Sequence, residues 1–276
     1  MPIVNEKNSY MIPRGRVTFN PLNAAGAYTG EIPFGNCPGV GFSTETEKAE
    51  HFSSEAGLAE KDASIIVRIT RTGTLTCDNF SGANLALFVA GEKTTHAQAA
   101  ATVADEEHTV MAGRLYQLGA TSSNPAGARN ITDVTVTTPD GLTTYAAGTD
   151  YNVDLGLGRL QIMAGGAIAA AATAAAPTNG GVAAVEIWVG YKTAAKQWEQ
   201  IRSGASAEVR GALRVVSDVA SGENRDWYFP DVTLTPSGEL PLVQEGTEFV
   251  SMEFGIEILK PANAQAMYID GRPQAI

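Results

Sequence analysis

The histidines and the short acidic runs are the residues whose types and spacing could support acid–base or metal chemistry. The triplet Asp105–Glu107 stands directly before His108, and a carboxylate beside an imidazole can hold a metal ion or exchange a proton. Consecutive strand residues alternate between faces, however, so adjacent carboxylates do not converge on one point. We interpret the triplet as a solvated turn. The other histidines, His51 and His96, lie in polar segments without ligand partners at helical spacing.

A second acidic pattern has the spacing of calcium ligands. Asp150, Asn152 and Asp154 follow one another at i, i+2 and i+4, but the glycine and the terminal glutamate of an EF-hand loop are missing, so calcium binding is the minor interpretation. The motifs GxSxG, HExxH, GxxxxGKS/T and GxGxxG do not occur. We therefore expect no catalytic residue, no metal and no cofactor, and predict that the protein is not an enzyme.

The two cysteines do not form a metal-binding or redox motif. Cys37 stands beside Pro38, and Cys77 follows an alternating, strand-like stretch, so neither belongs to a CxxC pair. We interpret them as two buried or half-buried thiols.

Composition limits the class of protein. The chain has 276 residues, is 44% hydrophobic and 18% charged, and carries a net charge of −11, which indicates a globular fold and a surface that repels phosphate. A grip on DNA or RNA through counterion release is therefore not expected. Residues 1–15 lack the apolar core of a signal peptide. The alanine-rich run Ala167–Ala176 reaches about half of the ~20 residues that a membrane span needs, so we expect no membrane contact.

Strand signals dominate the elements that must position these residues. In Ser64–Thr76, Ile66, Arg68, Thr70 and Thr72 alternate with Ile65, Val67, Ile69 and Arg71, which predicts a long strand covered on at least one side. Further predicted strands cover Arg16–Phe19, Glu31–Phe34, His108–Leu118, Ile131–Thr137, Arg159–Met163, Val182–Tyr191, Ala207–Val219, Trp227–Leu234 and Phe249–Leu259.

One short helix stands out against the strands. Ser81 can cap a helix that begins at Gly82, and Gly91 can supply the left-handed residue that ends it. At about ten residues this helix is too short to persist alone in water, so it must dock on a sheet. The sequence therefore predicts an all-β protein with one short flanking α-helix.

The middle third differs in composition. Residues 120–195 are poor in charge and rich in Thr, Gly and Ala, which indicates an inserted β unit between two parts of a main β domain, residues 1–119 and 196–276. Within the insert we predict that the segment Gly165–Gly181 is a surface loop, with a frayed helix as the alternative.

Three segments together resemble the major tail tube proteins of tailed bacteriophages. They read GVGFSTETEKAEHFSSEAGLAEKDASIIVRITRTGTLTCDNFSGANLALFVAG from Gly39 to Gly91, RDWYFPDVTLTPSGELPLV from Arg225, and EFVSMEFGIEILK from Glu248. The resemblance lies in the order of elements: strand, polar loop, long strand, short capped helix and further strands. It covers the N-terminal and C-terminal parts of the chain, and the middle unit matches less clearly.

The resemblance implies a structural virion protein. Its fold would be a β-sandwich or β-barrel with a flanking helix, and its subunits would form rings, commonly hexameric, that stack into the tube through which genomic DNA is ejected. Assembly would take place in the host cytoplasm, with the tape-measure protein and the tail terminator and baseplate proteins as partners. DNA would pass without specific binding. The alternatives are a surface adhesin or decoration β-module, a type VI secretion-like tube subunit, which shares the fold, and, weakest, a β-rich lyase or glycan-binding enzyme.

Two groups of site residues follow from the position of the match. Ser43, Glu45 and Glu47 share one face of an extended polar stretch, and we predict that they line the channel and repel DNA phosphates; a solvent-facing outer edge is the alternative. We predict that the loop from His51 to Asp62 contacts the next ring, with a plain flexible hairpin loop as the alternative. Its candidate residues are His51, Phe52, Ser53, Ser54, Glu55, Leu58, Glu60, Lys61 and Asp62.

Overall fold

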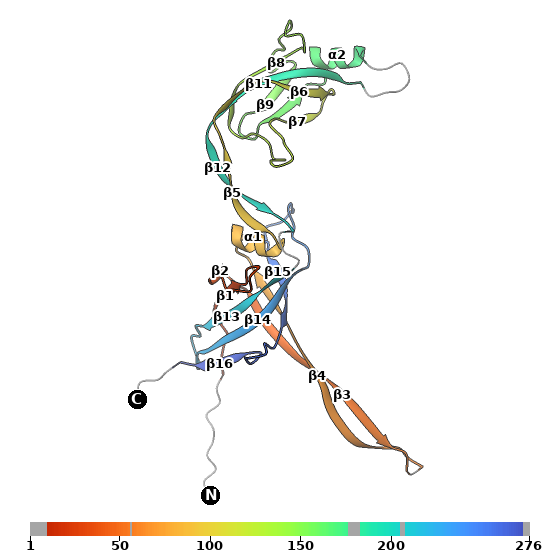
Figure 1. Cartoon of the computed structure of the whole chain (residues 1–276), viewed down its shortest axis with the longest axis vertical. Coiled ribbons are helices and arrows are strands. Elements are labelled where there is room, and N and C mark those ends of the chain that lie inside the picture. The colour runs from red at the N-terminus through yellow and green to blue at the C-terminus, as the bar shows by residue number, and fades with distance from the viewer. Residues whose placement is uncertain (1–9, 56, 176–182, 205–207, 273–276) are drawn as a thin grey trace. The chain divides into compact units, whose positions relative to one another are not determined.

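The computed structural model describes residues 10–55, 57–175, 183–204 and 208–272, and the chain divides into two units (Figure 1). Unit 1 comprises the residues up to 94 and from 201 onward, and unit 2 comprises residues 95–200. The chain leaves unit 1 in β5 (Glu92–Gln98) and returns in β12 (Lys196–Arg202), and these two strands pair with each other. The insert predicted at 120–195 lies within unit 2, which starts earlier because strands that precede residue 120 belong to it.

The predicted fold class is confirmed, since antiparallel strands dominate and helices are few and short. Among the described residues no helix has the length and apolar character that a bilayer crossing requires. The helix and strands of unit 1 are β1 (Gly15–Pro21), β2 (Ile32–Gly35), β3 (Gly39–Ser53), β4 (Glu60–Cys77), α1 (Gly82–Phe88), β13 (Val209–Ser217), β14 (Arg225–Ser237), β15 (Met252–Ile258) and β16 (Tyr268–Gly271).

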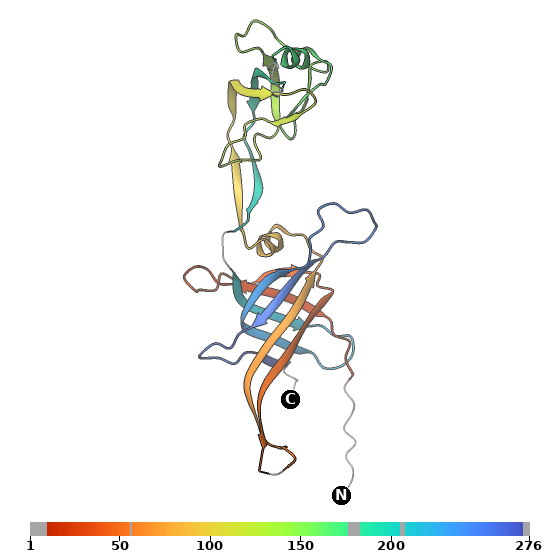
Figure 2. The ribbon, with the colours of Figure 1, turned by 90° about the vertical axis from the view of Figure 1, so that its right-hand side faces the viewer.

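Unit 1 is built on one antiparallel sheet with the strand order β2-β1-β13-β14-β15-β4-β3, and β16 pairs with β14 (Figure 2). Alternating side chains give the sheet one apolar face, as in β15, where Met252, Phe254 and Ile256 are buried and the residues between them are not. The sheet curls over this face, because Phe34 of β2 lies with its ring centroid 5.7 Å from that of Phe254, although three strands separate β2 from β15.

Helix α1 covers part of this core and has a cap at each end. Ser81 accepts a hydrogen bond from the Asn84 backbone N–H at 3.2 Å, which confirms the predicted N-cap. The prediction that Gly91 is the left-handed residue was wrong, because Ala90 takes that conformation (φ 46°) and the Gly91 N–H bonds to the Ala86 carbonyl at 2.8 Å. Gly91 is required for another reason: a Cβ there would lie 2.3 Å from the Arg202 carbonyl oxygen.

Unit 2 has its own core between two three-stranded sheets, ordered β6-β11-β8 and β7-β10-β9. Large side chains that are fully buried there include Leu118, Ile131, Leu160, Ile162, Ile168 and Ile187. Its remaining elements are β6 (Ala101–Val110), β7 (Leu115–Gln117), β8 (Ile131–Thr137), β9 (Tyr151–Asp154), β10 (Arg159–Ile162), α2 (Ala167–Ala174) and β11 (Val185–Thr193).

Helix α2 corrects the prediction of a surface loop at Gly165–Gly181. Residues 167–174 are helical, with Ile168 buried in the core of unit 2, and the Ala167 N–H donates to Asp150 Oδ1 at 2.6 Å. The buried face and the capping carboxylate stabilise a helix that propensity alone would not. Residues 176–181 of the predicted loop lie outside the described residues.

Candidate assembly surfaces

The hairpin of β3 and β4 is the most unusual feature of unit 1. Its strands have 15 and 18 residues and pair from Gly39–Thr76 at the root to Ser53–Glu60 at the tip, and their outer part extends away from the sheet (Figure 1). In β4 every described side chain from residue 60 to 70 is exposed. Ser64–Thr76 was predicted to be covered on at least one side. For the outer half of this strand the prediction is wrong in the single chain.

The exposed part of β4 carries four large apolar side chains. Ile65, Ile66, Val67 and Ile69 are each at least half exposed. The cross-strand register shifts between Glu47, which pairs with Arg68, and Lys48, which pairs with Ile66, so Val67 forms a β-bulge. The bulge moves Ile66 to the face opposite Arg68, which corrects the strict alternation predicted from the sequence.

Half of the predicted inter-ring loop proves to be strand. His51, Phe52 and Ser53 end β3, and Glu60, Lys61 and Asp62 begin β4, so among the described residues of this segment 54, 55 and 57–59 lie outside the strands. Cross-strand ion pairs, His51 with Asp62 and Lys61 with Glu50, hold these polar strand ends together. Ser54 and Glu55 lie in the exposed connection, where Leu58 is 73% exposed, and Phe52 is exposed at the end of β3. A contact of these residues with another ring stays a prediction.

The three channel candidates share one face of the hairpin. Ser43 Oγ lies 3.3 Å from Thr72 Oγ1, Glu45 pairs with Thr70, and Glu47 Oε2 lies 3.1 Å from Arg68 Nη1. All three side chains are exposed to solvent.

Two further carboxylates lie on this face, and sequence reasoning missed them. In the register of β15 with β4, Glu253 lies opposite Thr76 and Glu257 opposite Thr72, and both glutamates are exposed. The alternation in β15 could have shown that they point away from the core, but not which strand lies beside them. We name this surface the threonine face, which comprises Ser43, Glu45, Glu47, Arg68, Thr70, Thr72, Thr74, Thr76, Glu253 and Glu257.

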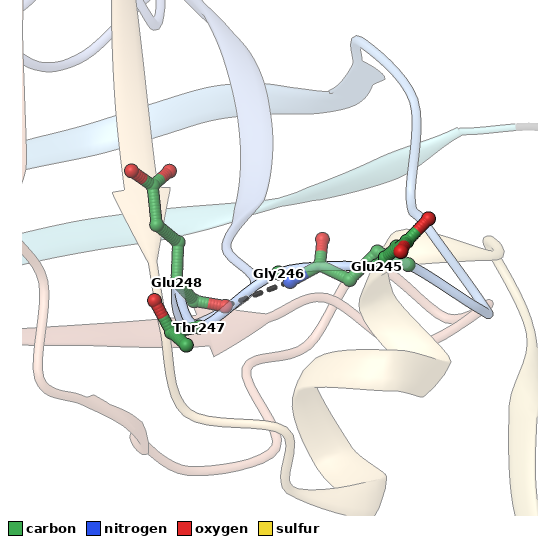
Figure 3. Close-up of a pocket in the computed structure, with 5 residues that line it drawn as sticks. Glu245, Gly246, Thr247 and Glu248 are labelled. Atoms are coloured by element: carbon green, nitrogen blue, oxygen red, sulfur yellow. Dashed lines mark hydrogen bonds between the residues drawn. The ribbon is translucent and has the colours of Figure 1, made fainter.

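A loop at the other end of β4 is also exposed. Residues 238–251 join β14 to β15, and Met252 pairs with Cys77 at the end of β4 that is farthest from the hairpin tip. Leu242, Val243 and Phe249 of this loop are almost fully exposed. Residues 244–248 line a pocket of about 350 Å³ (Figure 3). The dashed line marks the hydrogen bond that the Gln244 side chain donates to the Glu248 carbonyl at 2.7 Å. Nothing in this arrangement indicates a catalytic or ligand-binding site.

Unit 2 contains a polar network around Glu106, which sequence reasoning had assigned to a turn. That assignment was wrong, because Glu106 lies in strand β6 and its carboxylate is half-buried. The carboxylate accepts hydrogen bonds from the Tyr191 hydroxyl at 2.6 Å, from the Gly119 N–H at 2.9 Å and from His108 Nε2 at 2.9 Å. Burial raises the pKa of Glu106, but these donors outweigh it and leave the pKa below its ordinary value.

We expect this network to make the stability of unit 2 depend on acid pH. Because the folded-state pKa of Glu106 lies below the unfolded value of 4.5, its contribution is fully present above pH 4.5 and is lost as the pH falls through the folded-state pKa. The variant Glu106→Gln should be less stable at pH 7 and show a flatter acid limb, measured by urea unfolding at several pH values. The exposed neighbour variant Glu107→Gln should behave as wild type. Identical acid limbs for Glu106→Gln and wild type would contradict the assignment.

The calcium-like residues do not act together. Asp150 accepts from the backbone N–H groups of Ala146 and Ala167, whereas Asp154 Oδ1 accepts from the Leu157 N–H at 2.9 Å. Across the described part of the chain, no group of three or more His, Cys, Asp or Glu side chains could hold a metal ion. The acidic spacing therefore reflects a helix cap and a turn.

Comparison with protein families and with curated proteins assigns the chain to a family. No curated protein matches the chain. Residues 10–267 match the family described as "Protein of unknown function UCP028589", a span that includes all of unit 2 and most of unit 1, with the β3–β4 hairpin. The chain therefore belongs to this family.

Proposed function

We propose that the protein is a structural subunit that forms stacked rings, and that these rings make the hollow tail tube of a bacteriophage. The observation that carries the proposal is the β3–β4 hairpin, whose outer part exposes Ile65, Ile66, Val67 and Ile69. A two-stranded hairpin is marginally stable alone, and exposed apolar patches mark sites of association. Copies of the same chain can cover this hairpin in a ring or between rings.

The threonine face supports a channel wall. It combines short hydroxyl side chains with the carboxylates of Glu45, Glu47, Glu253 and Glu257, and only Glu47 among these has a cationic partner, Arg68, within ion-pair distance in the described residues. A wall with this charge repels phosphate, and the net charge of −11 per subunit adds to the repulsion. DNA can then pass such a wall without being held, and a tape-measure protein can occupy the channel before ejection.

Neutralising this wall is expected to change DNA passage and not assembly. The double variant Glu45→Gln and Glu47→Gln removes two exposed charges and buries nothing, so tubes should form as in wild type. Ejection from phage carrying the variant should slow, as measured by the rate of dye-reported DNA release. The matched control replaces Glu186 and Glu199 of unit 2 by Gln, and should leave the rate unchanged. Unchanged release from the Glu45/Glu47 variant would show that these residues do not face the DNA.

Electron microscopy of the purified chain tests the proposal. Long hollow tubes are expected, and their averaged cross-section should place the β3–β4 hairpin between subunits. Isolated rings would favour the secretion-type tube, and monomers at high concentration would favour the adhesin or decoration module. The latter alternative has one observation in its favour, since unit 2 has a separate core and is joined to unit 1 through β5 and β12.

A further inference from the structure

The two cysteines, remote in sequence, meet at the root of the hairpin. Cys37 lies two residues before the start of β3, and Cys77 is the last residue of β4. The Asp78 N–H donates to the Asn36 carbonyl at 3.2 Å, and the Asn36 side chain donates to Asp78 Oδ2 at 2.6 Å. Because residues 36 and 78 are hydrogen-bonded across the two segments, the next residues, Cys37 and Cys77, lie opposite each other.

Opposed positions of this kind suit a disulfide. Facing residues that do not themselves share backbone hydrogen bonds have Cα atoms roughly 4.5 Å apart. Disulfides need Cα separations of about 4.4–6.8 Å. The thiols also turn towards the same short stretch of backbone, since Cys77 Sγ donates to the Phe34 carbonyl at 3.2 Å and Cys37 Sγ to the Gly35 carbonyl at 3.8 Å.

The two thiols differ in access and in acidity. Cys37 is half-buried and can be reached from solvent, whereas Cys77 is buried. A side-chain hydrogen bond from Cys37 lowers the pKa of Cys77 to about 7, and the same interaction raises the pKa of Cys37. A thiol whose pKa is near the ambient pH is the best attacking group in thiol–disulfide exchange.

We propose that Cys37 and Cys77 are a redox-sensitive pair, which a low-molecular-weight disulfide such as oxidised glutathione converts into an intrachain disulfide. The inference is independent of the proposed function. In the first step one proton leaves the hydrogen-bonded pair, and Cys37, the thiol that solvent can reach, attacks oxidised glutathione as a thiolate while Cys77 keeps the remaining proton. A mixed disulfide forms on Cys37, and one glutathione thiolate leaves. In the second step the Cys77 thiolate attacks the Cys37 sulfur and expels the second glutathione thiolate. The cysteines lose two electrons and two protons, and oxidised glutathione becomes two molecules of reduced glutathione.

Because Cys37 reacts first and Cys77 second, each cysteine variant should give a different product with oxidised glutathione. Treatment of the full chain with oxidised glutathione, followed by alkylation and mass spectrometry, should give wild type a Cys37–Cys77 cross-linked peptide and no lasting adduct. Cys77→Ala should stop at a glutathione adduct on Cys37, because the second attack is lost. Cys37→Ala should remain unmodified, because the buried Cys77 is not reached. Cys77→Ser, whose hydroxyl can still donate to the Phe34 carbonyl, replaces Cys77→Ala if the alanine variant does not fold.

A stability measurement provides a second readout. The bond would close the chain between residues 37 and 77, so oxidised wild type should melt about 5–10 °C higher than the reduced protein, and dithiothreitol should reverse the shift. Cys37→Ala should show no such shift. Two unmodified thiols in folded wild type after treatment, or an adduct on Cys37 that persists beside a free Cys77, would overturn the proposal.

Discussion

Replacing Ile65 and Val67 by glutamate is expected to abolish tube formation without unfolding the subunit. The two side chains are 66% and 59% exposed in the single chain, so the exchange removes little packing within it. In an interface each would contribute about 1.5–3 kcal/mol by burial. Losing about 3 kcal/mol or more of association free energy raises the protein concentration needed for tube formation roughly 100-fold. Repulsion between the new carboxylates raises it further.

Sedimentation and electron microscopy measure this effect, and circular dichroism checks that the fold is retained. The matched control is the pair Leu142→Glu and Leu155→Glu, which makes the same kind of change at two exposed leucines that belong to unit 2. If the hairpin variant forms tubes at the wild-type concentration, then the exposed apolar residues of β4 are not the assembly contact.

Truncation of Phe254 to alanine is expected to be the most destabilising single change in unit 1. Its side chain is fully buried, and its ring meets Phe34 of β2 at 5.7 Å and Phe88 of α1 at 5.6 Å. One residue therefore joins the sheet, its curled edge and the helix. Phe→Ala at such a site costs about 3–5 kcal/mol, because the lost contacts leave a cavity.

Hydrogen exchange of the β14 and β15 amides reports on this unit separately from unit 2, and protection there should fall by the corresponding factor, about two to four orders of magnitude. Phe249→Ala is the control: this phenylalanine lies five residues before Phe254 but is 96% exposed, and its truncation should change stability by less than about 0.5 kcal/mol. Equal protection in the two variants would show that Phe254 is not the central contact of the core.

Local sequence patterns predicted those parts of the fold that depend on neighbours in the chain. The N-cap at Ser81 needs only the residues that follow it, and the alternation in β15 shows its buried side without knowledge of its partners. The bulge at Val67 could not be predicted, because it arises from the pairing of two strands and not from either strand alone. Helix α2 was missed for a similar reason, since the carboxylate that caps it, on Asp150, lies 17 residues away.

The residues of the threonine face could likewise be predicted only where they lie on one strand. The shared face of Ser43, Glu45 and Glu47 follows from a period of two, whereas Glu253 and Glu257 join them only through the pairing of β15 with β4. The contact between Cys37 and Cys77 likewise depends on how the hairpin closes. Contacts between residues far apart in sequence set both features, and a single sequence does not encode them in any local signal.

The pairing of β5 with β12 has a consequence for how this chain can change. Because the chain leaves and re-enters unit 1 through neighbouring strands, the ends of residues 95–200 lie side by side, and the segment is a self-contained cassette. Domains whose termini meet in this way can be exchanged without rebuilding the host fold. A tight turn that joins β5 directly to β12 would shorten the protein to unit 1, and a foreign domain spliced at the same place would be displayed once on every copy of the chain.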